Sequence, residues 1–273
     1  MLDLPSRFIS TDGYRTHYLE LGEGEPLVLI HGGGAGADGR GNWSGTMPLF
    51  AKSMRTIAYD MVGFGNSDAP DPEKFQYTQE ARIRQAIAFF EGLKAGPVSV
   101  IGNSMGGCTA LGVAMRRPDL MKSMVLMGSA GLTRKLDPAI VTIMKYDFSV
   151  EGMKKIIDAL THPGFNAGEE MLRYRHQLSI QPAVRTAYGA TMAWIGQQGG
   201  LYYEEGEIAT VSVPTLIFNG KNDRVIPMAE AYRFLELIKG SHGYFLPNCG
   251  HWAMIEHPQT FTRISLDFVR GVN

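Results

Sequence analysis

Cysteine is scarce in this chain of 273 residues, which contains only Cys108 and Cys249. Two cysteines provide neither a disulfide framework nor a cluster of metal ligands. A small domain held together by disulfides and a zinc-binding module are therefore both excluded as explanations of this sequence.

Long apolar runs and an excess of one charge are also absent. No run reaches the roughly 20 residues that span a bilayer, and residues 1–7 lack the basic start and apolar core of a signal peptide. The 26 Lys and Arg nearly balance the 27 Asp and Glu, so neither nucleic acid nor an acidic membrane is an expected partner. We expect a soluble, cytoplasmic protein that acts on a small molecule. Its oligomeric state, a homo-oligomer included, stays open.

The composition is that of a globular protein, with 44% apolar and 19% charged residues. The length favours one large α/β domain. Apolar runs predict a hairpin at 7–20 and strands at 26–30, 54–59, 96–100, 122–128, 213–219 and 243–246. Helical patterns fall between or after them, at 42–52, 78–93, 108–115, 229–238 and 258–270. This alternation predicts a mostly parallel, doubly wound sheet.

The alternation stops between residues 132 and 207. This segment is helical in composition, without a convincing buried strand, and predicts helices at 147–160, 169–180 and 182–198. It is too long for a simple crossover between two strands. We interpret it as a helical cap, or lid, over a core domain of residues 1–131 and 208–273. The alternative is a helical extension with no role at the site.

The pattern Gly-x-Ser-x-Gly at 102–106 directly follows one predicted strand and precedes a helix. In that context the pattern is typical of a nucleophile elbow, a sharp turn that exposes Ser104 above the sheet edge. Gly102 and Gly106 lack side chains that would block the two arms of such a turn.

A serine nucleophile requires a base and a carboxylate that orients the base. His251 follows the last predicted strand, and Asp223 follows the strand after the cap. The order Ser104, Asp223, His251 is the one expected in α/β-hydrolases, at the sheet edge where such sites assemble. We interpret His31 as a brace of the loop that it begins, and Asp60 as either a catalytic carboxylate or a cap of the turn after it.

Residues 31–43 form a glycine-rich loop that follows the strand at 26–30. Six glycines in this short stretch predict neither helix nor strand and leave backbone N–H groups free for a ligand. The phosphate-binding patterns are missing. An oxyanion loop of the His-Gly-Gly-Gly kind therefore fits better.

Three motifs together resemble the meta-cleavage-product hydrolases, which have the α/β-hydrolase fold and cleave carbon–carbon bonds in aromatic degradation. These are the elbow 102–107, the loop 31–34 with Asn42, and Gly250-His251-Trp252. The similarity continues through 60–65, 125–131, 198–201 and 252–258, and is greatest to members that act on bicyclic ring-fission products.

The resemblance implies hydrolysis of the C5–C6 bond of 2-hydroxy-6-oxohexa-2,4-dienoates, after ketonisation, to 2-hydroxypenta-2,4-dienoate and a carboxylic acid. It implies an oxyanion hole formed by the N–H groups of Gly33 and Met105. Further, it implies that Arg185, at the start of the predicted helix 182–198, faces the elbow and binds the substrate carboxylate; the alternative is a solvated charge on that helix. It also implies that no metal or organic cofactor is needed. The other residues that it places on the dienoate side are Gly34, Asn42, Asn103 and Trp252.

Two other classes fit the same residues. A carboxylesterase would use the same triad without a carboxylate-binding arginine, and a ligand receptor would share only the fold. The sequence leaves open whether cleavage runs through an acyl-enzyme or a gem-diol, and whether C6 carries an aryl or an alkyl group. It also leaves open whether particular cap side chains line the pocket or the cap core, namely Tyr146, Phe148, Met171, Met192 and Trp194.

Overall fold

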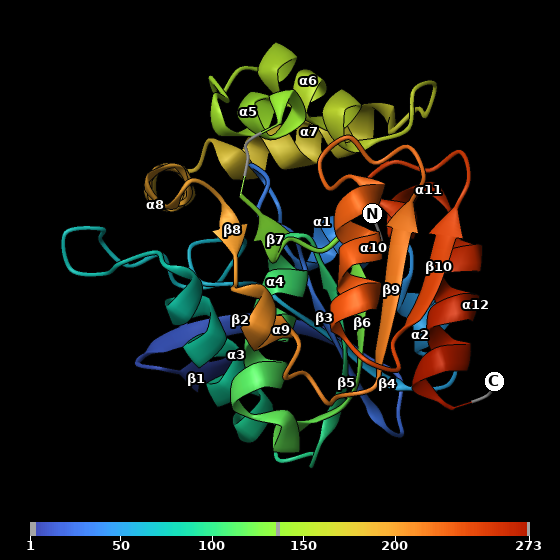
Figure 1. The fold of residues 1–273 in the computed structure, drawn as a ribbon. Coiled ribbons are helices and arrows are strands. Elements are labelled where there is room, and N and C mark those ends of the chain that lie inside the picture. Colours follow the sequence, from blue (N-terminus) through green and yellow to red (C-terminus); the bar gives the residue numbers. More distant parts are fainter. Residues whose placement is uncertain (1–3, 135–136, 272–273) are drawn as a thin grey trace.

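An eight-stranded sheet forms the centre of the protein in the computed structural model, which describes residues 4–134 and 137–271 (Figure 1). The spatial order is β1-β2-β4-β3-β5-β6-β9-β10; β1 and β2 are antiparallel to their neighbours and the other pairs are parallel. The strands are β1 (Ser6–Thr11), β2 (Tyr14–Leu21), β3 (Pro26–Ile30), β4 (Arg55–Tyr59), β5 (Val98–Asn103), β6 (Met121–Met127), β9 (Thr215–Gly220) and β10 (His242–Leu246). The predicted doubly wound sheet is confirmed.

Helices cover both faces of this sheet (Figure 1). One face carries α1 (Gly39–Trp43), α2 (Met47–Phe50) and α12 (Pro258–Val269), and the other carries α3 (Gln79–Gly92), α4 (Met105–Arg116) and α10 (Met228–Leu237). Three short helices complete this part of the chain: η1 (Pro118–Leu120), α9 (Glu205–Ile208) and α11 (Ala253–Glu256).

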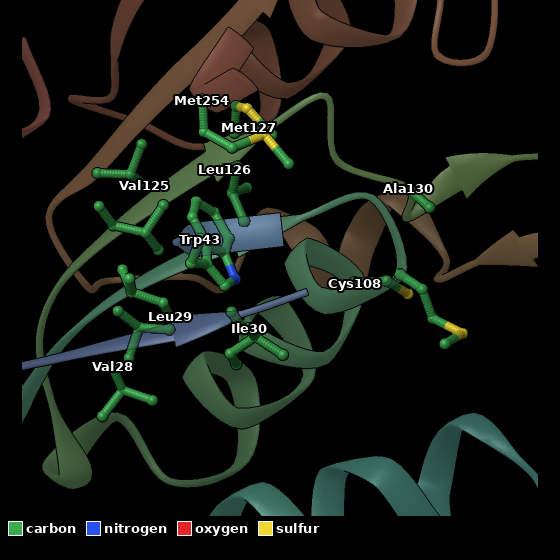
Figure 2. Packing of buried hydrophobic residues seen from close by; sticks show 14 of the residues in the cluster. Val28, Leu29, Ile30, Trp43, Cys108, Val125, Leu126, Met127, Ala130 and Met254 are labelled. Carbon is green, nitrogen blue, oxygen red and sulfur yellow. The ribbon is translucent and has the colours of Figure 1, made fainter. Parts of the chain in front are cut away.

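The core lies between these helices and the sheet. Residues 28–30 of β3 and 125–127 of β6 are buried, and Trp43 packs over them from one side while Cys108 lies on α4 (Figure 2). Strands covered on both faces bury every side chain, which explains why they are continuous apolar runs in the sequence.

The segment between β6 and β9 leaves the sheet, and its residues 138–198 lie beyond the carboxyl ends of the parallel strands (Figure 1). It begins with β7 (Leu132–Thr133) and later returns as β8 (Leu201–Tyr202), which pairs antiparallel with β7. Between these strands the described residues form α5 (Pro138–Met144), α6 (Val150–Leu160), α7 (Gly168–Ser179) and α8 (Pro182–Gln198). The sequence predicted neither α5 nor the two short strands. Helix α6 starts later than predicted because the Ser149 hydroxyl accepts a hydrogen bond from the N–H of Gly152 (2.8 Å) and caps the helix.

The predicted helix at 42–52 is wrong, and so is the prediction that the glycine-rich loop contains no helix. Two short helices replace it, and α1 includes Gly39 and Gly41. The Asp38 side chain explains this start, because it accepts a hydrogen bond from the N–H of Gly41 (2.6 Å) and caps α1. Glycine disfavours helix formation, so α1 forms because of this cap and not because of the intrinsic helix propensity of its residues.

The parallel strands all end at the edge that faces α5–α8 (Figure 1). The loops after β3, β5, β9 and β10 are therefore neighbours in space, although they are far apart in the sequence. No helix within residues 4–134 and 137–271 is long and apolar enough to cross a membrane.

Candidate active site

Ser104 occupies a strained turn between β5 and α4. Its backbone has φ 55° and ψ −117°, a conformation that costs a non-glycine residue roughly 1–3 kcal/mol. A Cβ on Gly102 would lie 2.5 Å from the carbonyl oxygen of Gly106, so the two arms of the turn approach too closely for side chains. The geometry is that of a nucleophile elbow, and Ser104 lines a cavity above it.

His251 and Asp223 are in direct contact beside this turn. The Nδ1 atom of His251 lies 2.7 Å from Oδ2 of Asp223, and the other carboxylate oxygen accepts N–H groups of Val225 (2.8 Å) and Ile226 (2.9 Å). Since an ionised carboxylate only accepts, Nδ1 is the donor and Nε2 remains available as a base. His251 is 2% exposed and lines the same cavity as Ser104. Within the described residues no hydrogen bond joins these two side chains, as is common before substrate binds.

The two candidate oxyanion donors also meet at this cavity. Met105 is the first residue of α4, where a backbone N–H has no partner within the helix. Gly33 lies against it: a Cβ on Gly33 would be 2.8 Å from Cε of Met105. Both residues line the cavity with Ser104.

The empty space of the cavity, counted together with the open solvent at its mouth, is about 710 Å³. Its polar side chains are joined to one another. The amide of Asn42 donates to Asn103 (3.4 Å) and accepts from Arg175 (3.4 Å), while Arg175 also donates to the carbonyl of Ala35 (3.0 Å). These contacts gather the polar groups in one part of the cavity.

The other predicted dienoate-side residues lie at this polar part. The Arg175 guanidinium stands 4.7 Å above the Trp252 ring, and a Cβ on Gly34 would be 3.3 Å from that guanidinium. Gly34, Asn42, Asn103 and Trp252 all line the cavity.

Arg185 does not line the cavity, and the prediction that its side chain faces the cavity is wrong. Arg185 is exposed on α8 and its guanidinium stacks on Phe148, 4.3 Å from the ring centre. The arginine in the cavity is Arg175 of α7, which is 1% exposed. Burial lowers the pKa of Arg175 to about 10, and one of its nitrogens, Nε, has no hydrogen-bond partner.

Helical periodicity contained the signal that separates these two arginines. Arg175 falls four residues after Met171 and three before Leu178, so it shares the apolar face of α7. The buried face of α8 comprises Val184, Ala187, Tyr188, Thr191, Met192 and Ile195. Arg185 lies outside that pattern, which marks it as a surface residue.

Apolar side chains from α5, α6, α8, β8 and the loop after β9 line the rest of the cavity: Ile140, Ile143, Met144, Leu160, Met192, Ile195, Leu201, Val225 and Ile226. Of the five cap residues left open by the sequence, only Met192 lines this cavity. Tyr146 and Phe148 line a second, separate pocket, and Trp194 lines a third pocket. Met171 packs against the hydrophobic core.

His31 and Asp60 hold the surrounding loops. The Nδ1 atom of His31 donates to the carbonyl of Gly32 (2.7 Å), its Nε2 accepts the N–H of Met61 (2.9 Å), and burial lowers its pKa to about 4. Asp60 accepts N–H groups of Gly39 (2.7 Å) and Asn66 (2.8 Å). Asp60 is therefore a cap of its turn, and His31 braces the glycine-rich loop.

Comparison with known proteins reveals extensive similarity. Residues 25–258 match the family model described as alpha/beta hydrolase fold. The chain is 48% identical to a 2-hydroxy-6-oxo-6-(2'-aminophenyl)hexa-2,4-dienoic acid hydrolase of Metapseudomonas resinovorans, over 96% of this chain and 90% of the relative. It is 32% identical to a 2-hydroxymuconate semialdehyde hydrolase of a Pseudomonas species, over 96% and 93%. A crystal structure of a serine hydrolase involved in carbazole degradation matches with a TM-score of 0.91 and 46% identity, over 98% of this chain and 99% of the other.

Proposed function

The chain belongs to the meta-cleavage-product hydrolases of the α/β-hydrolase family, and from this premise we propose that it hydrolyses 2-hydroxy-6-oxohexa-2,4-dienoates with an aryl group at C6. The products are 2-hydroxypenta-2,4-dienoate and an aromatic carboxylic acid. The relative at 48% identity bears the name of a hydrolase for such a substrate, with an aminophenyl group.

The observation that carries this proposal is the buried Arg175 at the polar part of an otherwise apolar cavity. An uncompensated guanidinium is costly to bury unless an anion meets it. In residues 4–134 and 137–271 it forms no ion pair with a carboxylate. The dienoate carboxylate would fill that role as a charge-assisted partner, while the aryl group would occupy the part of the cavity lined by α5 and α8.

The first chemical step is ketonisation. Nε2 of His251 takes the proton of the 2-hydroxyl group, C2 becomes a carbonyl, and C5 receives a proton from the imidazolium. C5 is now a tetrahedral carbon next to C3=C4, so the electrons of the C5–C6 single bond can later move through C3=C4 toward the new 2-oxo group. Arg175 holds the neighbouring carboxylate during this shift of negative charge.

The second step is attack at C6. Ser104 Oγ adds to the C6 carbonyl, its proton passes to His251, and the oxygen becomes an anion near the N–H groups of Gly33 and Met105. When C5–C6 breaks, its electron pair forms C4=C5, the C3=C4 pair shifts to C2=C3, and the 2-oxygen takes the proton from His251. Water then releases the acid from Ser104, with His251 again as base.

Residues 132–207 act in this proposal as a cap, with residues 1–131 and 208–273 as the core domain. Support comes from the lining of the cavity, because α5–α8 supply Arg175 and much of the apolar wall while the core supplies Ser104, Asp223 and His251. Both cysteines are free and buried, which supports a cytoplasmic setting.

The test uses the yellow colour of ring-fission products. The wild-type protein should bleach 2-hydroxy-6-oxo-6-phenylhexa-2,4-dienoate and release benzoate and the pentadienoate in equal amounts. Ser104→Ala should bind the dienoate but hydrolyse it at least ~10³-fold more slowly. p-Nitrophenyl acetate serves as the comparison substrate. Efficient ester turnover with no bleaching would identify a carboxylesterase and refute the proposal.

A further inference from the structure

A buried carboxylate connects the glycine-rich loop to the cap helix that carries Arg175. Asp38 is 1% exposed, and its Oδ2 accepts a hydrogen bond of 2.5 Å from the hydroxyl of Tyr174. Tyr174 lies on α7 and directly precedes Arg175. The Asp38 carboxylate also caps α1, the helix that carries Asn42, through its other oxygen. One side chain therefore contacts both elements that hold the polar part of the cavity.

The loop fits closely against α7 at this point. A Cβ on Gly36 would overlap the backbone carbonyl of Arg175, and a Cβ on Gly41 would lie 3.2 Å from the Tyr174 ring. Gly36 has φ +64°, which glycine adopts without strain. Because these glycines have no side chains, the loop can pack directly against α7. The Asp38–Tyr174 hydrogen bond then connects the loop to α7 through side chains.

The negative charge of Asp38 connects this hydrogen bond to substrate binding. Arg175 forms no ion pair within the described residues, and Asp38 is the carboxylate whose charge acts most strongly on it. A carboxylate ligand on Arg175 and an ionised Asp38 would therefore compete for the same positive charge.

We propose that Asp38, adjusted by the hydroxyl of Tyr174, is a positioning residue that sets how tightly Arg175 binds the substrate carboxylate and makes this affinity depend on pH. The inference rests on the proposed function. Ionised Asp38 weakens binding by compensating Arg175, and neutral Asp38 leaves the guanidinium free for the ligand. Substrate binding then draws a proton onto Asp38.

The surroundings of Asp38 support titration near neutrality. Burial and then the charge of Asp60 raise the pKa of Asp38 to about 7, against the lowering effects of the Tyr174 hydroxyl, the Gly41 N–H and Arg175. The titratable and charged groups that surround it are Asp60 after β4, His17 of β2 bonded to Asp60, Arg40 of α1, and Tyr174 and Arg175 of α7.

The experiment measures the dissociation constant of the phenyl dienoate from pH 5.5 to 8.5 in a Ser104→Ala background, where turnover does not interfere. The reference protein should bind several-fold more weakly as the pH rises through 7. Asp38→Asn loses the charge, while its amide oxygen can still accept the N–H of Gly41 and its NH2 group can donate to the Tyr174 oxygen, so its affinity should stay at the low-pH value. Tyr174→Phe removes a donor to the ionised carboxylate and should move the midpoint to higher pH.

Tyr203→Phe is the matched control. Its hydroxyl also joins the segment 132–207 to the core, at the carbonyl of Cys108 (2.8 Å), but makes no contact with Arg175. Its pH profile should equal that of the reference protein. A profile that is unchanged by Asp38→Asn, or that moves equally in the two tyrosine variants, would overturn the inference.

The proposed function can fail separately. A wild-type protein that does not bleach the dienoate would refute that function, and the same variants would then be compared by their thermal shift with benzoate over the same pH range. Benzoate stabilisation that falls through pH 7 in the reference protein and not in Asp38→Asn would sustain the inference. Equal curves would overturn it.

Discussion

Replacement of Arg175 by Gln tests the proposed carboxylate site most directly. Gln is shorter than Arg and has no charge, but it keeps a polar amide that can hydrogen-bond inside the cavity. The change therefore removes the cation from the cavity, together with the Arg175 hydrogen bond to the carbonyl of Ala35, and leaves some empty space. Thermal melts should establish that the variant is folded before its kinetics are compared.

The expected size of the effect follows from the contacts of Arg175. A hydrogen bond to a charged group contributes about 1.5–3 kcal/mol, so two bonds to one carboxylate at the lower bound contribute about 3 kcal/mol. At about 1.4 kcal/mol per factor of ten, kcat/KM for the phenyl dienoate should fall by ~10². The unpartnered Nε and the burial of the side chain make a large loss reasonable, because water competes poorly there.

The assay compares the dienoate, by its loss of absorbance, with p-nitrophenyl acetate in one preparation of each protein. The neutral ester has no carboxylate, so its hydrolysis should change by less than threefold. Arg185→Gln is the matched control, since this arginine is exposed and stacks on Phe148 outside the cavity. Equal losses on both substrates, or an equal effect of the two arginine substitutions, would refute the role of Arg175.

Three further predictions concern other parts of the site and its frame. Asp223→Asn should lower kcat by ~10³–10⁴ because Nδ1 of His251 loses its acceptor; stopped-flow rates within tenfold of wild type would contradict this. Gly36→Ala should lower the free energy of unfolding in urea by at least ~1–3 kcal/mol, since φ is +64° and the new Cβ meets Arg175 backbone. Gly45→Ala is the control, because a Cβ at Gly45 would meet no atom within 4 Å. Equal urea midpoints for the two variants would refute the predicted strain at Gly36. Burial raises the pKa of Glu230 from 4.5 to about 7, so the native state holds a proton that the unfolded state has lost, and stability falls as the pH rises from about 4.5 through 7. Glu230→Gln should therefore show a smaller drop in Tm between pH 5.5 and 8, and an identical drop would argue against this titration.

The sequence by itself determined the sheet and the position of the nucleophile. Strands buried on both faces must be continuous apolar runs, which is why residues 26–30 and 122–128 were recognisable. The elbow was recognisable because a sharp strand-to-helix turn requires small residues at 102 and 106 whatever the rest of the protein is. These requirements are local or follow from burial alone.

Short elements were determined by tertiary contacts. Helix α1 contains two glycines and forms where the Asp38 side chain caps it, and β7 and β8 are two residues each and exist through their pairing with one another. Their intrinsic preferences are weak, so the sequence around them does not reveal them.

The identity of the arginine in the cavity depended on both the sequence and the tertiary structure. Arg175 and Arg185 lie on the neighbouring helices α7 and α8, and the motifs that carry the family resemblance include neither of them. Helical periodicity places Arg175 on an apolar face, but only the packing of α7 against the loop 34–41 shows that this face is turned toward the cavity lined by Ser104. An arginine is buried there because the tertiary structure supplies Ala35, Asn42 and Trp252 around it, which no local pattern in the sequence records.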